Sequence, residues 1–401
     1  MKPKHGKHIL TINSGSSSLK TALFLMDKKE TMELSARIER IGLSRGYFQI
    51  KDGKGRILAE EHPRLPDQDA ALNKFLKWLQ KRKTPLAAVG HRVVNGGLHY
   101  DQPELVTPRM EKTLSGLEPL DPNHLPQELK AVKTVRRFYP DLAQVACFDT
   151  AFHRHMPDVA QWYPLPRELW REGVRRYGFH GLSYEYLIHE MARVAGPQAA
   201  RGRVIIAHLG NGASVAAIRG GKSMDTTMGF TPTGGLMMGT RSGDLDPGVV
   251  LYLLREKFMP LPAVSDLVNH RAGLLGVSGI SPDLRDLMAQ RAKNPRAAEA
   301  IELFCYQARK FLGALAGALG GLDTLVFTAG IGENMPWIRR RICQRLDFLG
   351  IHLDSALNER NAAVISRPGS QVTVRVMRTN EELMIARHTR RLLRHKIRNE
   401  G

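Results

Sequence analysis

The sequence has few cysteines and lacks the features of a secreted or membrane protein. Its 401 residues contain three cysteines, an odd number without CxxC spacing, which predicts neither a disulfide framework nor a structural zinc site. We expect no signal peptide, because Asn13, three serines and Lys20 occupy the segment where an apolar core would be needed. The longest uncharged apolar run, at 311–322, is too short to span a bilayer. These absences predict a cytoplasmic protein.

Two familiar nucleotide-binding loops are also missing. The segment "GGKS" at 220–223 resembles the end of a Walker A loop, but Ala216 stands where the first glycine is required. The segment "GNG" at 210–212 does not extend to a dinucleotide fingerprint, because Val215 replaces the last glycine. If the protein binds a nucleotide, it does so without either loop.

Acidic residues are scarce compared with basic ones. The chain has 39 Asp and Glu against 59 Lys and Arg, a formal net charge of +20. Such a balance can mark a nucleic-acid binder, or it can aid solubility and attract small anionic substrates. The basic residues are spread over several segments and are not gathered into an arm with interleaved aromatics. We therefore expect small anions as partners and not nucleic acid or a membrane.

Strands and helices alternate along the chain, which predicts an α/β protein. The segment 1–60 has the short apolar runs and glycine turns of strands, and the strand pattern restarts near 203. Further helices are predicted at 68–83, 126–140, 246–257 and 297–320, with a basic one at the C-terminus, and further strands at 86–94, 143–152, 324–334 and 372–377.

Two stretches share one design. "TINSGSSSLKTAL" at 11–23 and "AHLGNGASVAAI" at 207–218 each contain an apolar strand, a polar residue, a glycine-containing turn and a second apolar strand. Such an echo is consistent with a duplicated domain, with a cleft between the copies, although short echoes also arise by chance.

Glycine-rich turns are the main sign of phosphate binding. They occur in "NSGSSS" at 13–18, "HLGNGAS" at 208–214 and "AGIGEN" at 329–334, with Lys20 close to the first. Glycine allows the backbone to approach an anion, and successive N–H groups can form an anion-binding nest. A polar hairpin without a ligand is the alternative for each turn.

Two arginines lie in glycine-rich surroundings. Arg92 interrupts an apolar strand, and Arg241 shares a loop with Asp244 and Asp246. A buried arginine is costly unless it is paired, so a structural ion pair is the common explanation for one such residue. Two of them could instead bind a carboxylate or a phosphoryl group in a bidentate manner.

Other polar residues stand where strands or helices are expected to end. Asp149 could be a turn residue or helix cap, and His180 could be a structural histidine. Asn380 is a good helix cap, so Glu381 and Glu382 could be first-turn acids that favour the helix dipole. The same acidic position also suits a carboxylate that holds a metal.

Taken together, these segments resemble the acetate kinase family, the acetokinases. The matching segments follow the order of the family from "ILTINSGSSSLK" through "GHRVVNGG", "FDTAFH", "RRYGFHGLSYEYL", "AHLGNGASVAAIRGGKSMDTTMGFTP", "MGTRSGDLDPG", "SGISPDLRDL" and "FTAGIGEN" to "TNEELMIARHT". They cover nearly the whole chain, which makes the resemblance highly specific.

The resemblance implies an actin-like ATPase fold of two duplicated domains with ribonuclease-H-like cores and a central cleft. An N-terminal domain for the acyl group and the metal would comprise 1–150 and 380–401, and a C-terminal nucleotide-binding domain would comprise 151–379. The implied reaction is the reversible, ATP-dependent phosphorylation of acetate to acetyl phosphate, with Mg²⁺ or Mn²⁺, in a homodimer.

The resemblance also implies roles for individual positions. It implies metal binding by Asn13 and Glu381, and catalytic roles for Asp149, His180 and Arg241. The acyl substrate would contact Arg92, Val94, Leu120, Phe179 and Pro232. The nucleotide would contact Ser18, Lys20, His208, Leu209, Gly210, Asn211, Gly212, Asp283, Leu284, Arg285, Gly330, Ile331, Gly332, Glu333 and Asn334.

Several positions near the implied acyl site depart from the family pattern. Asn95 and Asp121 stand where the family usually has histidines, Leu98 replaces an acidic residue, and Thr233 and Gly234 replace "LE" in "TPLEGL". These changes remove none of the implied catalytic residues, but they leave the acyl preference open. A kinase that prefers propionate or butyrate is therefore the first alternative, and a non-catalytic actin-fold regulator is the second.

Overall fold

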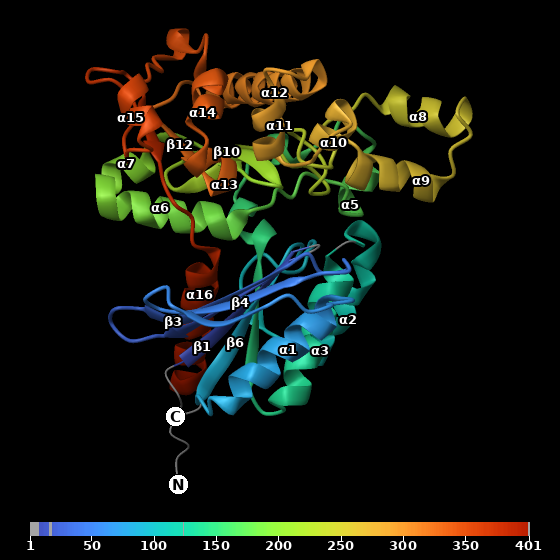
Figure 1. Cartoon of the computed structure of the whole chain (residues 1–401), viewed down its shortest axis with the longest axis vertical. Coiled ribbons are helices and arrows are strands. Elements are labelled where there is room, and N and C mark those ends of the chain that lie inside the picture. Colours follow the sequence, from blue (N-terminus) through green and yellow to red (C-terminus); the bar gives the residue numbers. More distant parts are fainter. Residues whose placement is uncertain (1–7, 16–17, 123, 400–401) are drawn as a thin grey trace. The chain divides into compact units, whose positions relative to one another are not determined.

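The computed structural model describes residues 8–15, 18–122 and 124–399; of Leu120 and residues 395–399 it describes the backbone alone. The chain divides into two compact units, one made of Met1–Ala151 with Asn380–Gly401 and the other of Phe152–Thr379. Each unit contains its own sheet with helices packed against it (Figure 1). The α/β class predicted from the sequence is confirmed, whereas the roles predicted for the two domains stay a prediction.

The first unit is built on an eight-stranded sheet with the order β5-β4-β3-β2-β1-β6-β8-β7. Neighbours from β5 to β1 run antiparallel, whereas β1, β6 and β8 run parallel to one another. The carboxyl ends of these three parallel strands therefore lie at one edge of the sheet. The strands are β1 (His8–Ser14), β2 (Ser18–Leu25), β3 (Thr31–Glu39), β4 (Tyr47–Asp52), β5 (Ile57–Glu61), β6 (Leu86–Val93), β7 (Glu104–Leu105) and β8 (Ala143–Phe148).

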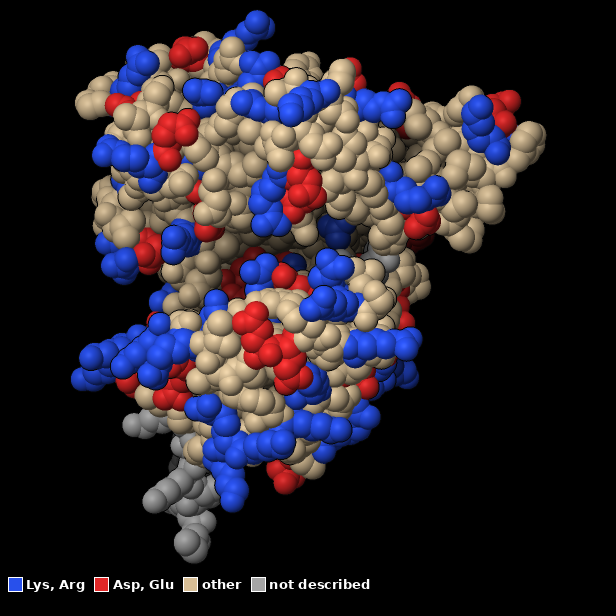
Figure 2. All heavy atoms as spheres, in the orientation of Figure 1, with Lys and Arg blue, Asp and Glu red and all other residues tan. Residues whose placement is uncertain are grey.

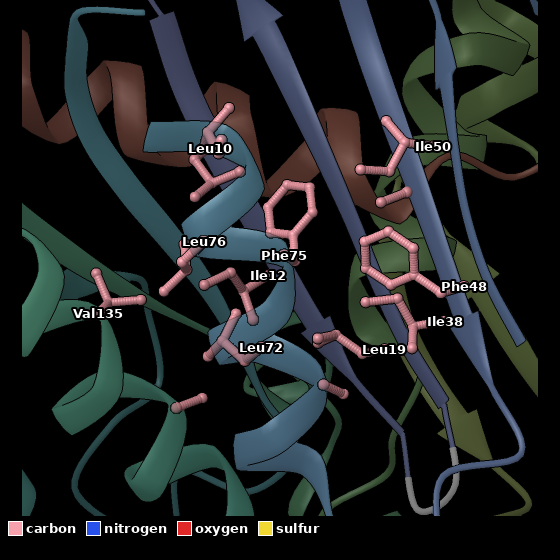
Figure 3. Close-up of a cluster of buried hydrophobic side chains, with 14 of the residues drawn as sticks. Leu10, Ile12, Leu19, Ile38, Phe48, Ile50, Leu72, Phe75, Leu76 and Val135 are labelled. Carbon is pink, nitrogen blue, oxygen red and sulfur yellow. The ribbon is translucent and has the colours of Figure 1, made fainter. Parts of the chain in front are cut away.

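Helix α1 illustrates why the helices cover this sheet. Asp67 caps its N-terminus, because the side chain accepts a hydrogen bond of 2.8 Å from the Ala70 N–H. Leu72, Phe75 and Leu76 recur at helical spacing and are buried against the sheet (Figure 3). Each such side chain stabilises the fold by roughly 1.5–3 kcal/mol.

The helices of the first unit are α1 (Gln68–Lys81), α2 (Pro108–Gly116), η1 (Glu118–Leu120), α3 (Leu125–Phe138) and α16 (Glu381–Asn399), and η2 (Asp149–His153) begins in this unit.

Helix α16 packs on the first unit's sheet very close to β6. An ideal Cβ at Gly90 would lie 2.3 Å from Thr389 Oγ1 and 2.5 Å from Ile385 Cγ2, both on α16. Any residue other than glycine at position 90 would therefore collide with α16. The close contact fixes the position of Glu381, the first residue of α16, relative to the sheet.

The second unit has a five-stranded sheet with the order β11-β10-β9-β12-β13. Neighbours from β11 to β9 run antiparallel, and β9, β12 and β13 run parallel. The strands β3, β2, β1, β6 and β8 of the first unit have the same order and directions. The duplication suggested by the two similar hairpins is thus confirmed. The strands are β9 (Arg203–Leu209), β10 (Ala213–Arg219), β11 (Lys222–Thr226), β12 (Thr324–Thr328) and β13 (Thr373–Val376).

Helices make up most of the remainder of the second unit. The segment 329–334, predicted as a glycine-rich turn that continues a strand, is instead helix α13, because the chain turns sharply at Ala329 (φ +63°) directly after β12. The helices are α4 (Asp158–Gln161), α5 (Arg167–Arg171), α6 (Gly181–Ala195), α7 (Pro197–Arg201), α8 (Pro247–Arg255), α9 (Leu261–Asp266), η3 (Leu267–Arg271), α10 (Gly273–Ser278), α11 (Leu284–Gln290), α12 (Pro295–Leu319), α13 (Ala329–Asn334), α14 (Pro336–Cys343), η4 (Asp347–Leu349) and α15 (Ser355–Glu359).

Basic side chains are distributed over the faces of both units that Figure 2 shows, among acidic and neutral ones. Some arginines are paired, as Arg203 is with Asp323 at 2.5 Å and Arg387 with Glu30 at 2.7 Å. Exposed pairs of this kind each contribute about 0–1 kcal/mol to stability. Within the described residues, no helix is long and apolar enough to cross a membrane.

We expect Gly90→Ala to destabilise the protein by about 1–3 kcal/mol, because the added methyl group would force α16 away from β6. A fall in the urea midpoint of unfolding checks this. The matched control is Gly116→Ala at the end of α2, where the added methyl group meets no atom within 4 Å and where we expect no loss of stability. Equal midpoints for the two variants would contradict the close contact.

Candidate active site

Four of the predicted site residues meet where the parallel strands of the first unit end. Asn13 lies near the end of β1, Arg92 near the end of β6, and Asp149 directly follows β8. Glu381 begins α16, which packs on the same three strands. Ligands of α/β proteins commonly bind beyond the carboxyl ends of parallel strands. This cluster is therefore a candidate site for a small anion.

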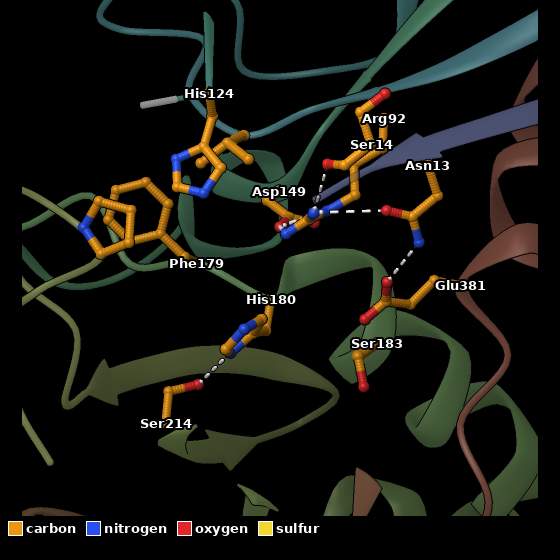
Figure 4. A network of polar contacts seen from close by, with 12 residues as sticks. Asn13, Ser14, Arg92, His124, Asp149, Phe179, His180, Ser183, Ser214 and Glu381 are labelled. Atoms are coloured by element: carbon orange, nitrogen blue, oxygen red, sulfur yellow. Dashed lines mark hydrogen bonds and ion pairs between the residues drawn. The ribbon is translucent and has the colours of Figure 1, made fainter. Parts of the chain in front are cut away.

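Arg92 and Asp149 form a buried ion pair at the centre of the cluster (Figure 4). Asp149 Oδ2 accepts hydrogen bonds of 2.9 Å from Arg92 Nε and 2.5 Å from Nη2. Arg92 Nη1 donates to Asn13 Oδ1 at 3.3 Å. Burial alone would lower the pKa of Arg92, but the charges of Asp149 and Glu381 raise it above its usual value. The guanidinium therefore stays charged in the site.

Asn13 links the ion pair to the acidic start of α16. Its Nδ2 donates to Glu381 Oε2 at 2.9 Å and to Glu382 Oε1 at 3.2 Å. Lys20 pairs with Asn13 across β1 and β2, so both side chains lie on one face of the sheet. The predicted cap is also present, because Asn380 Oδ1 accepts a hydrogen bond from the Leu383 N–H. Glu381 and Glu382 can therefore lie in the first turn of a helix capped by Asn380 and also serve as ligands.

The oxygen atoms of Asn13, Glu381 and Glu382 are of the kind that Mg²⁺ prefers. Among the residues that the structure describes, no group of three or more His, Cys, Asp or Glu side chains is arranged to hold a metal. The donor set therefore fits a hard cation that binds through one or two carboxylates and keeps other ligands of its own.

Sequence reasoning missed a buried acid behind the cluster. The carboxylate of Glu128, on α3, accepts hydrogen bonds of 3.1 and 3.2 Å from the Val94 N–H. Burial raises the pKa of Glu128 well above its usual range, the charge of Asp121 raises it further, and Arg92 opposes the rise. Nothing in the surrounding segment "PQELK" distinguishes Glu128 from an ordinary helix-surface acid.

The positions predicted to contact the acyl group are apolar and mostly buried. Val94 follows β6 and Phe179 precedes α6, with exposed fractions of 2% and 1%, and Pro232 is also buried. The side chain of Leu120 lies outside the described residues. Val94 belongs to the first unit, and Phe179 and Pro232 belong to the second.

Two of the positions that depart from the family pattern, Asn95 and Asp121, have local hydrogen-bond partners. Asn95 is buried and its Oδ1 accepts a hydrogen bond of 2.8 Å from the Gly97 N–H. Asp121 Oδ1 pairs with His124 Nδ1 at 2.7 Å. Leu98 is 45% exposed. A Cβ at Gly234 would lie 3.4 Å from Asp244 Oδ1.

In the second unit, the turn between β9 and β10 carries the residues predicted to bind phosphate. Its backbone closes through a hydrogen bond of 3.1 Å from the Gly210 N–H to the Gly212 carbonyl, and Asn211 O accepts a bond from the Gly239 N–H. The corresponding turn of the first unit joins Gly15 N–H to Ser18 O at 2.8 Å, while Ser16 and Ser17 lie outside the described residues. The two hairpins thus share a short turn at the same end of their sheets.

His180 and Arg241 lie beside this turn. A Cβ built on Gly212 would be 3.3 Å from His180 Nε2 and 3.9 Å from Arg241 Nη1. His180 adopts φ +59°, a backbone conformation that few non-glycine residues take, and stacks on His208 with ring centroids 4.1 Å apart. Strained backbone of this kind is frequent at functional sites. Pro232 O accepts a hydrogen bond of 3.3 Å from Arg241 Nη1.

The other predicted nucleotide contacts are partly occupied with local structure. Asp283 caps α11 and pairs with Arg285 at 2.5 Å. Glu333 Oε1 accepts a hydrogen bond of 2.9 Å from the Ala329 N–H. The side chains of Leu209 and Leu284 are buried in the core, so only their backbone could meet a ligand. In α13, Asn334 Nδ2 donates to Gly330 O, and Ile331 and Gly332 lie between them.

Comparison with solved structures shows the same fold in known kinases. The chain is similar to an acetate kinase of Porphyromonas gingivalis, with a TM-score of 0.86, 39% identity, and coverage of 97% of this chain and 100% of the other. It is also similar to a propionate kinase of Francisella tularensis subsp. tularensis SCHU S4, with a TM-score of 0.90, 34% identity, and coverage of 96% and 100%. The fold and the two clusters therefore define a kinase of the actin-like ATPase class.

Sequence comparison narrows this class. Residues 8–387 match the model of the acetokinase family. An acetate kinase of Rhodopseudomonas palustris (strain TIE-1) is 47% identical over 392 residues, which cover 96% of this chain and 98% of that relative. The chain belongs to the acetokinase family. It is a phosphotransferase with a carboxyl group as acceptor, and ATP is its phosphoryl donor.

We expect Glu128→Gln to become more stable relative to the wild type as the pH rises from 5 to 8. In the unfolded chain a glutamate loses its proton near pH 4.5, whereas burial raises the pKa of Glu128 in the folded protein. Wild-type stability therefore falls as the pH rises through this window, and glutamine cannot show that loss. Urea unfolding of both proteins at several pH values measures the difference.

The control for this measurement is Glu60→Gln, at an exposed position on β5. Its effect on stability should change little over the same range. A Glu128→Gln difference that is independent of pH would contradict a raised pKa at Glu128.

Proposed function

We propose that the chain phosphorylates acetate reversibly by direct in-line transfer, with the acyl substrate bound at the Arg92 cluster. The observation that carries this proposal is the fixed, charged guanidinium of Arg92 at the end of β6, held by Asp149. Phosphoryl transfer needs little covalent chemistry from the protein, and it depends on positioning and on positive charge around the transferring group.

Arg92 is the proposed ligand of the substrate carboxylate. Asp149 uses one oxygen for both hydrogen bonds to Arg92, which holds the guanidinium in a fixed orientation. Acetate is already ionised at neutral pH, so it needs no strong base to act as a nucleophile. We therefore assign Asp149 the role of organising Arg92, the metal and water, and not of accepting a proton.

Asn13 and Glu381 are the proposed metal residues, with Glu382 as a further oxygen donor that the sequence did not single out. The carboxylates of Glu381 and Glu382, at the start of α16, both accept hydrogen bonds from Asn13 Nδ2. These residues would hold Mg²⁺ or Mn²⁺, which would supply positive charge to stabilise the negative charge that develops during transfer.

The turn at 210–212 is the proposed site for nucleotide phosphates, with His180 and Arg241 stabilising the transferring group. Their proximity to Gly212 supports this assignment, because two cationic or N–H-donating side chains approach the same turn. Ser18 and Lys20 in the first hairpin, and residues 283–285 and 330–334, keep their predicted nucleotide roles as proposals.

Propionate is the specific alternative to acetate as the preferred acyl substrate. The apolar set at Val94, Phe179 and Pro232 suits a short aliphatic chain, and the likeness to a propionate kinase favours propionate as the second candidate. One extra methylene changes the free energy of binding by only about 1–3 kcal/mol in such pockets. Acetate should therefore be preferred over propionate by no more than roughly 200-fold.

We also propose a homodimer and a cytoplasmic location. Phe258 and Leu261, beside α8 and α9, are 84% and 70% exposed, which is unusual for large apolar side chains outside an interface. All three cysteines are buried, and burial raises the pKa of the Cys305 and Cys343 thiols to about 12. Such unreactive thiols are compatible with a reducing compartment.

The test of the proposed reaction is acyl phosphate formation, trapped as hydroxamate, from ATP, Mg²⁺ and acetate, propionate or butyrate. We expect the order acetate, propionate, butyrate in kcat/KM. The variant Arg92→Lys should raise KM for the acid about tenfold or more, because lysine keeps the charge but loses the bidentate geometry. Asp149→Asn should lower kcat, since Arg92 would lose its ionic partner.

Two outcomes would refute the assignment. If the protein forms no acyl phosphate from any of the three acids, the proposed function is wrong. If Asp149→Asn keeps full turnover with unchanged metal dependence, the role given to Asp149 is wrong. Lys54→Arg, at an exposed position of the β4–β5 turn, is the control for a basic substitution that should change neither constant.

The double variant Phe258→Asp, Leu261→Asp should be monomeric, because charged side chains cannot be buried in an apolar interface without a large cost. Light scattering coupled to size exclusion should give one chain mass, against two for the wild type. Leu43→Asp, at a 52% exposed apolar side chain of the first unit, is the control and should stay dimeric. If the double variant remains dimeric, Phe258 and Leu261 do not lie in the dimer interface.

A further inference from the structure

A chain of buried hydroxyl groups lies behind His180. Ser214 Oγ is 2.8 Å from His180 Nδ1 (Figure 4) and 2.5 Å from Tyr184 Oη. Ser214 and Tyr184 are both 0% exposed. No role has been given so far to either hydroxyl group, although buried polar groups of this kind are costly unless they are satisfied.

The fold explains why these three residues meet. His180 is the residue that caps the start of α6, and the N–H of Tyr184, in the first turn of that helix, donates to the His180 carbonyl at 3.1 Å. Both side chains are therefore near the start of α6, and both meet Ser214 Oγ. On β10, Ser214 lies two residues from Ala216 and therefore on the same face, which packs on Tyr184 and Leu187. The apolar contact between α6 and the sheet thus places the hydroxyl groups of Tyr184 and Ser214 next to each other and next to His180.

A second histidine, His208, also has a buried serine as its hydrogen-bond partner. His208 and Ser214 are directly opposite each other in the β9–β10 ladder, and Ser183 Oγ lies 2.9 Å from His208 Nδ1. The His180 ring stacks on the His208 ring with an interplanar angle of 14°. His180 is therefore fixed at Nδ1 by Ser214 and on one ring face by His208. Its Nε2 is the nitrogen beside Gly212 and Arg241.

We propose that Ser214 and Tyr184 are positioning residues that make Nε2 of His180 the protonated, donating nitrogen at the phosphate turn. In a neutral imidazole, the hydrogen bond made by one nitrogen decides which nitrogen carries the proton. If Tyr184 donates to Ser214 Oγ, the Ser214 proton is available for Nδ1, and the imidazole proton is on Nε2. If the imidazole is charged, both hydroxyl groups reverse and Nε2 still donates.

This inference rests on the proposed role of His180 in stabilising the transferring phosphoryl group. Removal of the Tyr184 hydroxyl lets the Ser214 hydroxyl rotate and the ring lose its preferred tautomer. The ring of the tyrosine, which packs in the core, is retained in Tyr184→Phe. In metal sites, where a hydrogen-bond partner likewise fixes the tautomer of a histidine, loss of that partner lowers metal affinity or activity by roughly ten- to a hundredfold.

The experiment compares Tyr184→Phe and Ser214→Ala with Tyr177→Phe in steady-state kinetics. Tyr177 is a matched control, because it is also buried and its hydroxyl donates to the Gly173 carbonyl at 2.9 Å, away from His180. We expect Tyr184→Phe and Ser214→Ala to lower kcat at least tenfold with KM for ATP within about twofold, and Tyr177→Phe to keep wild-type kcat. Equal kcat for Tyr184→Phe and Tyr177→Phe overturns the proposal.

A double-mutant cycle with His180→Ala separates positioning from a general structural role. If the hydroxyl chain acts through His180, adding Tyr184→Phe to His180→Ala should lower kcat no further. A loss in the double variant equal to the product of the two single losses overturns the proposal. Failure of the wild type to form any acyl phosphate would instead refute the proposed function, so the two failures are distinguishable.

Discussion

The buried charge of Arg92 is the constraint on which the first unit's cluster depends. A guanidinium in the middle of an apolar strand is stable only with a partner, and the partner, Asp149, follows the neighbouring parallel strand. The parallel register of β6 and β8 brings the ends of both strands to one edge, so a short side chain reaches the arginine. Asn13, at the end of β1, completes the arrangement from the other side.

Such a pair is poor evidence for stability. Replacing a buried ion pair by apolar residues is often neutral or stabilising, whereas removing one partner costs roughly 3–5 kcal/mol. The ion pair of Arg92 and Asp149 is therefore not accounted for by stability alone, which agrees with the ligand-binding role proposed for Arg92. Glu128 lies near the same ion pair, and burial together with the charge of Asp121 raises its pKa while the charge of Arg92 opposes that rise.

The second unit has the same strand order but different polar residues at the ends of its strands. Its hairpin of β9 and β10 corresponds to β1 and β2, yet the polar residues near its turn are His180, His208 and Arg241 in place of carboxylates. Duplication of the fold thus supplied two strand ends of the same geometry, and the side chains placed there diverged. In each unit an apolar helix–sheet contact is what holds the polar groups in position.

The sequence by itself determined the fold class and the duplicated hairpins, because strand periodicity and an ordered set of motifs are local properties of the chain. It singled out Asn13, Arg92, Asp149 and Glu381 through the family resemblance, and the structure showed that their side chains meet. Sequence reasoning failed where the outcome depended on distant neighbours. The segment 329–334 has the composition of a turn but becomes α13, since the strained residue Ala329 redirects the chain after β12.

Only the tertiary structure decided which polar residues became partners. Glu128 resembles a surface acid in the sequence, and its burial follows from the packing of α3 against the sheet. Ser214 and Tyr184 are 30 residues apart and meet only because α6 packs on the face of the sheet that carries Ser214. Contacts of this kind have no local signature, because their free energy comes from desolvation that exists only after the elements have packed.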